Sequence, residues 1–269
     1  MKNKKRVVFV AGGNHTGSTL VGCVLGANEK SAFEHFHVGE AHAFFKHDNA
    51  RFGDPRRAAQ MGDGAVWHKI SHTVGYKKAY SEIFSKIPSM RTLIDSSKTA
   101  SNLKSQLLEL PKNRYEFQCV LTFKSFDKMW LSGKVRNKPR NAIRDWILDY
   151  EKILRLLRDH NVPFTVVKVT DFIGAPSEQT KLLCKFCSIP YFPKKEEYWK
   201  WPFAHLYGAG TQRKHFLDPA TGGYDIGRTT NRDTFVNDFL RSPRVISIES
   251  DLNELYRRQR GENISIKSR

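Results

Sequence analysis

The sequence VVFVAGGNHTGSTLVGCVL at residues 7–25 constrains the fold more than any other stretch. Val7 to Val10 form a short apolar run typical of a buried strand, and the apolar run from Leu20 to Leu25 suits a helix packed on a sheet. The loop between them, residues 12–19, carries three glycines. Backbone N–H groups and the positive end of the dipole at a helix start favour an anion. The stretch therefore predicts an α/β fold with a phosphate-binding loop.

This loop differs from the nucleotide-binding P-loop at one decisive position. Gly12 and Gly17 are separated by four residues, as in a P-loop, but Ser18 stands where the P-loop lysine should follow. The loop can hold a phosphate, but it lacks the side chain that reaches the β- and γ-phosphates of ATP or GTP. A P-loop kinase or NTPase with a degenerate loop is retained as an alternative.

Composition limits the other function classes. The chain has 269 residues, of which 39% are hydrophobic, so it can bury a core. Its net charge of +18 attracts anionic partners, but the basic residues are spread along the chain and no nucleic-acid-binding motif is present. No apolar run approaches the roughly 20 residues of a membrane span. We therefore expect a cytoplasmic protein without a membrane span, and nucleic acid is not the favoured partner.

The four cysteines and the histidine-rich stretch at residues 31–45 do not predict a metal site. Cys23 and Cys119 lie in apolar runs, and Cys184 with Cys187 is best explained as one face of a helix. The C-x-x-C pair lacks a second ligand pair at zinc-site spacing. The sequence therefore predicts no bound metal and no disulfide framework.

Further strand and helix patterns extend the α/β prediction. A polar turn at Ser96 to Lys98 is expected after the second strand, and ligands in such sheets bind at the carboxyl ends of strands. One domain is predicted over residues 1–269, with an irregular cofactor or substrate loop at 193–230 and a basic tail at 261–269. The fold class is a P-loop-type three-layer domain, with helices on both sides of a central parallel sheet. The predicted strands are 92–95, 117–123 and 164–169, and the predicted helices are 76–86, 99–110, 142–157, 181–186, 234–240 and 252–260.

Several short motifs occur in a defined order along residues 6–260. They are His15-Thr16-Gly17-Ser18-Thr19 after the first strand, Gly39-Glu40 after the first helix, Asp95-Ser96-Ser97-Lys98 after the second strand, Lys124 with Ser132 eight residues later and Arg136 four further on, Val169-Thr170-Asp171-Phe172, and His205-Leu206-Tyr207-Gly208. In this order and spacing they resemble the motifs of sulfotransferases that use 3′-phosphoadenosine 5′-phosphosulfate (PAPS), in their bacterial and tyrosylprotein-sulfotransferase-like branch.

The resemblance implies a sulfotransferase that moves the sulfonate of PAPS in line to an acceptor hydroxyl and releases 3′-phosphoadenosine 5′-phosphate (PAP). Glu40 would be the general base, and Lys98 with the loop at 15–19 would stabilise the leaving phosphate, with His15 as the third catalytic candidate. The acceptor would be a small molecule, glycan or peptide with a hydroxyl, and the basic charge favours an acidic one. The residues implied for cofactor binding are Asn14, His15, Thr16, Gly17, Ser18, Thr19, Lys124, Ser132, Arg136 and Arg213.

Each assignment has a structural alternative. Glu40 could be a helix N-terminal charge or a solvated carboxylate, and Lys98 could simply follow a helix cap made by Ser96 or Ser97. His15 stands where the family has a basic residue and Lys124 where it has arginine, and lysine lacks the bidentate fork of arginine. A protein that binds PAP or nucleic acid without catalysis is therefore a further alternative.

Overall fold

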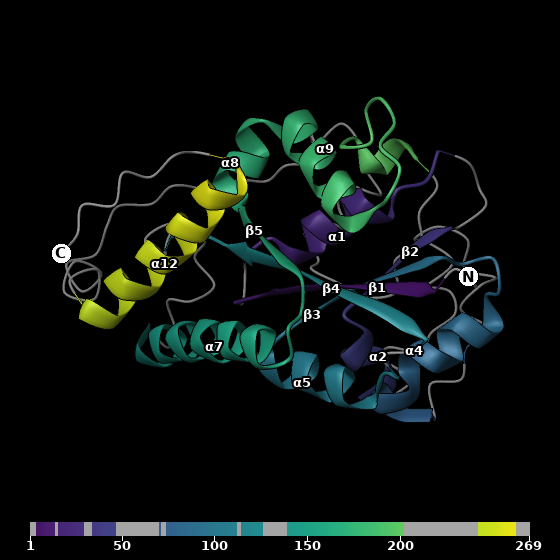
Figure 1. The fold of residues 1–269 in the computed structure, drawn as a ribbon, viewed down its shortest axis with the longest axis horizontal. Coiled ribbons are helices and arrows are strands. Elements are labelled where there is room, and N and C mark those ends of the chain that lie inside the picture. Colours follow the sequence, from purple (N-terminus) through teal and green to yellow (C-terminus); the bar gives the residue numbers. More distant parts are fainter. Residues whose placement is uncertain are drawn as a thin grey trace.

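The computed structural model describes residues 4–13, 16–29, 34–46, 70, 74–111, 114–125, 139–201 and 242–261. Five strands form one sheet: β1 (Lys5–Gly12), β2 (His35–Gly39), β3 (Thr92–Lys98), β4 (Tyr115–Phe123) and β5 (Phe164–Lys168). Their order is β2-β3-β1-β4-β5, and every neighbouring pair is parallel. All five carboxyl ends therefore lie along one edge, with β1 in the centre (Figure 1).

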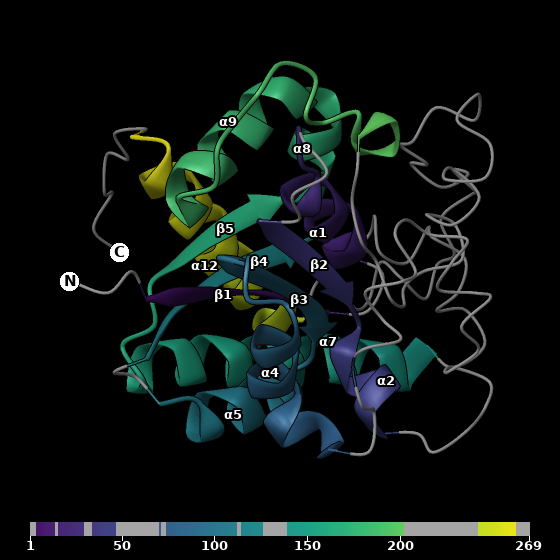
Figure 2. The ribbon, with the colours of Figure 1, turned by 90° about the vertical axis from the view of Figure 1, so that its right-hand side faces the viewer.

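Helices cover both faces of the sheet. In Figure 2, α1, α8 and α9 lie above the sheet, and α2, α4, α5 and α7 lie below it. Helix α12 packs against β5 and α7. The bounds are α1 (Ser18–Gly26), α2 (Ala41–Lys46), α4 (Gly75–Lys86), α5 (Ala100–Glu109), α7 (Pro139–Asp159), α8 (Val169–Gly174), α9 (Pro176–Cys187), the 3-10 helix η3 (Tyr198–Lys200) and α12 (Pro243–Gln259). The predicted three-layer α/β architecture with a parallel sheet is confirmed.

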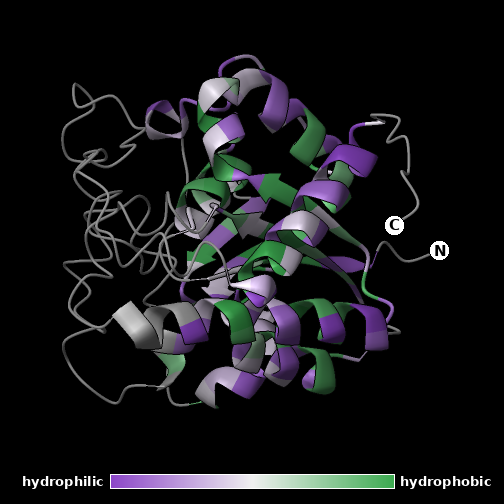
Figure 3. Ribbon diagram, turned by 90° about the vertical axis from the view of Figure 1, so that its left-hand side faces the viewer, coloured by the Kyte–Doolittle hydropathy of each residue, from purple (hydrophilic) through white to green (hydrophobic). Residues whose placement is uncertain are grey.

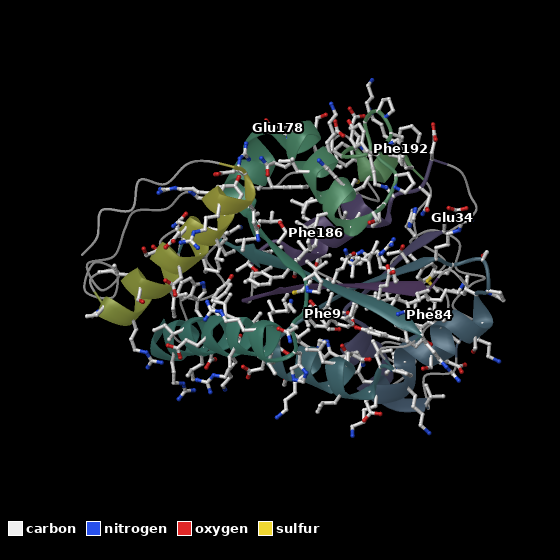
Figure 4. The ribbon with its side chains drawn as sticks, in the orientation of Figure 1. Phe9, Glu34, Phe84, Glu178, Phe186 and Phe192 are labelled. Atoms are coloured by element: carbon white, nitrogen blue, oxygen red, sulfur yellow. The ribbon has the colours of Figure 1, made fainter. Side chains whose placement is uncertain are left out.

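The alternation of side chains along β1 explains how the two layers are built. Val8 and Val10 pack with α1, α8 and α9, whereas Phe9 and Ala11 face α7 and α12. All of these residues are fully buried, as expected for the central strand of a parallel sheet. Figure 3 shows the apolar strands between helices of mixed polarity, and Figure 4 shows Phe9 at the level of the sheet and Phe186 in the helical layer above it.

Most elements predicted from the sequence occur where they were expected. The four predicted strands are β1, β3, β4 and β5, and the four cysteines are buried. The predicted turn at Ser96 to Lys98 is wrong, because β3 continues through Lys98. Strand β2 was not predicted. The predicted helix at 234–240 lies outside the described residues.

Within the described part of the chain, no helix is both long and apolar enough to cross a membrane. Nor do three or more histidine, cysteine or acidic side chains gather there in a way that could hold a metal ion.

Candidate active site

The carboxyl edge of the sheet brings four of the predicted segments together. Glu40 follows β2, Lys98 ends β3, the glycine loop follows β1, and Lys124 follows β4. The register places Gly39 beside Asp95, Ala11 beside Lys98, and Gly12 beside Thr122. The predicted residues thus come from four adjacent strands, in the order Glu40, Lys98, loop, Lys124.

The described end of the glycine loop, at Gly17, is closely packed and leads directly into α1. Gly17, directly before α1, has a left-handed φ of 80° and makes no side-chain cap. A Cβ there would lie 2.8 Å from Val169, so only glycine allows this close approach. The first N–H groups of α1, at Ser18 and Thr19, have no acceptor within the helix itself. The start of α1 can therefore accept an anion.

Buried hydroxyl groups hold the two ends of the loop against β4. The Thr16 hydroxyl donates to the Gly13 carbonyl at 2.7 Å and lies 3.1 Å from the Thr122 hydroxyl. The Tyr150 hydroxyl, from α7, donates to the Thr122 carbonyl at 2.7 Å. At Gly12, a Cβ would lie 2.5 Å from that same carbonyl. The loop is therefore fixed at both ends, and the Thr16 hydroxyl is already engaged within the protein.

Glu40 and Lys98 form an ion pair at this edge. Lys98 Nζ lies 2.6 Å from Glu40 Oε1, and only 17% and 16% of the two side chains are exposed. Glu40 precedes α2 directly, but it is not a solvated charge.

The helix that follows Lys98 is α5, and its N-cap is Thr99, whose hydroxyl accepts from the Asn102 N–H. The structure therefore excludes the capping role considered for Ser96 or Ser97.

Asp95 is the centre of a buried hydrogen-bond network behind this pair. Its Oδ2 accepts from the hydroxyls of Tyr76 at 2.9 Å and Tyr80 at 2.6 Å. Its Oδ1 accepts from the Ser97 N–H at 2.8 Å and the Ser97 hydroxyl at 2.6 Å. The Ala41 N–H points to the same oxygen at 3.4 Å. All these partners are donors, which is the environment of an ionised carboxylate.

Burial affects the ionisation of this network. It raises the pKa of Asp95 above 3.8, while the hydrogen bonds from Ser97 and the two tyrosines act in the opposite direction. Burial, and next the charge of Asp95, raise the pKa values of Tyr76 and Tyr80 well above 10. The two phenols therefore remain protonated and can donate to Asp95 throughout the neutral range.

The structure does not reach every predicted residue. Asn14, His15, Ser132, Arg136 and Arg213 lie outside the described residues, as does the segment 205–208. Four residues that support the site were not predicted from the sequence: Thr122, Tyr150, Tyr76 and Tyr80. Two signals were present: Thr122 is a polar residue near the end of an apolar strand, and the two tyrosines are four residues apart on α4.

Two solved structures share this fold. The sulfotransferase domain from the Synechococcus PCC 7002 olefin synthase has a TM-score of 0.56 and 14% identity, over 94% of this chain and 96% of that one. The sulfotransferase domain from the curacin biosynthetic pathway has a TM-score of 0.53 and 15% identity, over 93% and 98%. No family model and no curated protein matches the sequence. At such low identity the likeness establishes the fold.

Proposed function

We propose that this protein is a sulfotransferase that moves a sulfonate group from PAPS to an acceptor hydroxyl. The observation that carries the proposal is the pairing of Glu40 with Lys98 at 2.6 Å, beside a phosphate-type loop. The two solved sulfotransferase domains with the same fold support it. Of the motifs that resemble those of the PAPS-dependent family, residues 16–19, 39–40, 95–98 and 169–172 lie at or shortly after the carboxyl ends of strands, where parallel α/β sheets bind ligands.

The residues at the edge fit the donor. Bound PAPS would supply an activated sulfonate whose leaving group is a phosphate. The N–H groups and hydroxyls of Ser18 and Thr19 would hold the 5′-phosphate, because the first turn of α1 carries no side-chain cap. Lys124 at the end of β4 would face the 3′-phosphate, together with Ser132 and Arg136. Asn14, His15, Thr16, Gly17 and Arg213 complete the proposed binding set.

Glu40 and Lys98 would divide the chemistry between them. The Glu40 carboxylate would accept the proton of the acceptor hydroxyl, and such a base typically contributes about 10²–10⁴-fold. The Lys98 ammonium would balance negative charge on the leaving side, and its low exposure strengthens that interaction. His15 would donate a hydrogen bond to the leaving phosphate. No part of this scheme requires a metal ion.

Asp95 argues against the kinase or NTPase alternative. A P-loop NTPase needs a lysine after the second glycine and an acidic residue that holds Mg²⁺. Ser18 takes the place of the lysine. Asp95 is the acid after a neighbouring strand, but it is fully buried and both its oxygens accept hydrogen bonds from the protein. Using it for Mg²⁺ would break this network.

The acceptor is proposed only as a class. The net charge of +18 favours an acidic small molecule, glycan or peptide that carries a hydroxyl. Part of that charge serves the donor, which is itself anionic. The proposed location of the enzyme is the cytoplasm.

Titration calorimetry with PAP, at physiological salt, tests the nucleotide part of the proposal. We expect PAP to bind at micromolar concentration and ATP with Mg²⁺ to bind much more weakly. No heat at high micromolar PAP, together with tight binding of ATP and Mg²⁺, would replace the proposal with the NTPase alternative.

The Glu40→Gln variant tests the catalytic part. Transfer should fall by about 10²–10⁴-fold while the affinity for PAP stays within about twofold, because Glu40 is assigned to the acceptor and not to the nucleotide. Full activity of this variant would remove Glu40 from the role of base. PAP binding by a wild-type protein that transfers sulfonate to no hydroxyl in an acceptor panel would favour the non-catalytic alternative.

A further inference from the structure

The end of β3 is tied to the start of α2 by side chains of the Asp95–Lys98 segment. The Ser97 hydroxyl donates to Asp95 Oδ1 at 2.6 Å and accepts from the His42 N–H at 3.1 Å. The Ala41 N–H lies 3.4 Å from Asp95 Oδ1. The N–H groups of the first two residues of α2 are therefore directed at acceptors on β3.

Two residues that take part in these contacts, Ala41 and Ser97, are each adjacent in sequence to one member of the ion pair. Glu40 directly precedes Ala41, and the chain reaches it through Gly39, whose φ is 69°. Lys98 directly follows Ser97 and has a φ of 50°, which is uncommon for a residue other than glycine. The network therefore fixes the backbone that follows Glu40 and the backbone that precedes Lys98.

The backbone before Lys98 is held separately. The Ser97 carbonyl accepts from the Thr99 N–H at 2.7 Å and from the Asn102 amide at 2.9 Å. The surrounding protein thus imposes the left-handed conformation of Lys98, and strained residues of this kind persist only where their surroundings determine them. The conformation places Lys98 Nζ within 2.6 Å of Glu40.

We propose that Asp95 and Ser97 are positioning residues that set the separation and direction of the Glu40 and Lys98 side chains. The tyrosines of α4 fix Asp95 Oδ2, which leaves Oδ1 to hold Ser97 and the start of α2. The inference rests on the proposed function, because it assigns a catalytic consequence to the geometry of that pair. Asp95 and Ser97 are fully buried, so the inference assigns them no contact with the donor or the acceptor.

Two adjacent serines provide a matched comparison. Ser96 and Ser97 are both fully buried in β3, and each hydroxyl makes a hydrogen bond inside the protein. The Ser97 hydroxyl bonds to α2, whereas the Ser96 hydroxyl lies 3.0 Å from His37 Nε2, on the neighbouring strand. Ser97→Ala and Ser96→Ala therefore remove a similar group, but only the first loosens the attachment of the ion pair.

The first measurement is steady-state kinetics of both variants with PAPS and an acceptor. Ser97→Ala should lower kcat by about 10–100-fold and leave KM for PAPS within about twofold, as expected when catalytic groups are displaced by about 1 Å. Ser96→Ala should keep the wild-type kcat even if its melting temperature falls. Equal kcat values for the two variants would overturn the inference.

The second measurement does not require sulfonate transfer. The rate at which acetic anhydride modifies the Lys98 amine, followed by peptide mass spectrometry, should rise severalfold in Ser97→Ala and stay unchanged in Ser96→Ala. If the wild type transfers no sulfonate, the proposed function fails while this rate still tests the positioning. An unchanged Lys98 rate in Ser97→Ala would overturn the inference. Ser97→Cys, which leaves no cavity and weakens the hydrogen bonds, replaces Ser97→Ala if that variant does not fold.

Discussion

A double-mutant cycle on Glu40 and Lys98 measures how strongly the two side chains interact. The variants are Glu40→Gln, Lys98→Met and the double replacement. Because more than four-fifths of each side chain is buried, solvent screens this pair less than a surface pair, which is worth between about 0 and 1 kcal/mol. Coupling between contacting residues ranges from about 0.5 to 3 kcal/mol. We expect a value of about 2 kcal/mol, in the upper half of that range.

The free energy of unfolding in urea, followed by circular dichroism, is the assay. Each single variant leaves one mostly buried charge without its partner. Its loss in the free energy of unfolding should therefore exceed half the loss measured for the double variant. The pair Arg258–Glu254 on α12 is the control, since 59% and 42% of its side chains are exposed. Its coupling should stay below about 0.5 kcal/mol. A Glu40–Lys98 coupling as small as the control would show that the pair does not form in solution.

Three further predictions concern buried groups away from this pair. Burial lowers the pKa of Lys195 from 10.5 to about 8, so the folded state loses this proton at a lower pH than the unfolded state. The free energy of unfolding should therefore rise by about 3 kcal/mol between pH 8 and 10.5. Lys195→Met should remove this rise when urea unfolding is measured across that pH range. Burial also lowers the pKa of His35 from 6.5 to about 4, so stability should fall by about 3 kcal/mol as the pH drops from 6.5 to 4, and His35→Gln should remove that loss. Gly22→Ala should cost about 1–3 kcal/mol, because its Cβ would lie 2.3 Å from His37 Nε2, whereas Gly174→Ala, with nothing within 4 Å, should cost nothing measurable in thermal unfolding.

The missed strand β2 shows where sequence patterns were insufficient. Its sequence HFHVG alternates two histidines with Phe36 and Val38, and the histidines hid the apolar alternation of a strand. His37 is nevertheless fully buried. It lies against Gly22 and Gly26 of α1, and its ring is 3.0 Å from the Ser96 hydroxyl. A polar residue can occupy this interior position because two helix glycines make room and a hydroxyl accompanies the ring.

Polar residues buried in a strand also explain why the end of β3 was predicted as a turn. Asp95, Ser96 and Ser97 are turn formers by propensity. In the structure all three are fully buried, and each side chain has a hydrogen-bond partner on another element or within the segment. Tertiary hydrogen bonds therefore override the local preference. These partners are Tyr80, His37 and the start of α2, which lie 15 to 59 residues away in the sequence.

The ion pair itself could not be derived from either motif alone. Local patterns placed Lys98 after an apolar strand, which fixes the edge of the sheet to which it belongs. Glu40 reaches the same corner only because β2 pairs with β3 at the end of the sheet order β2-β3-β1-β4-β5. That order depends on crossover connections and on packing between layers, which no short window of sequence contains. Lys98 was therefore predictable from the local strand pattern and Glu40 only from the motif resemblance, whereas their 2.6 Å contact is a property of the assembled sheet.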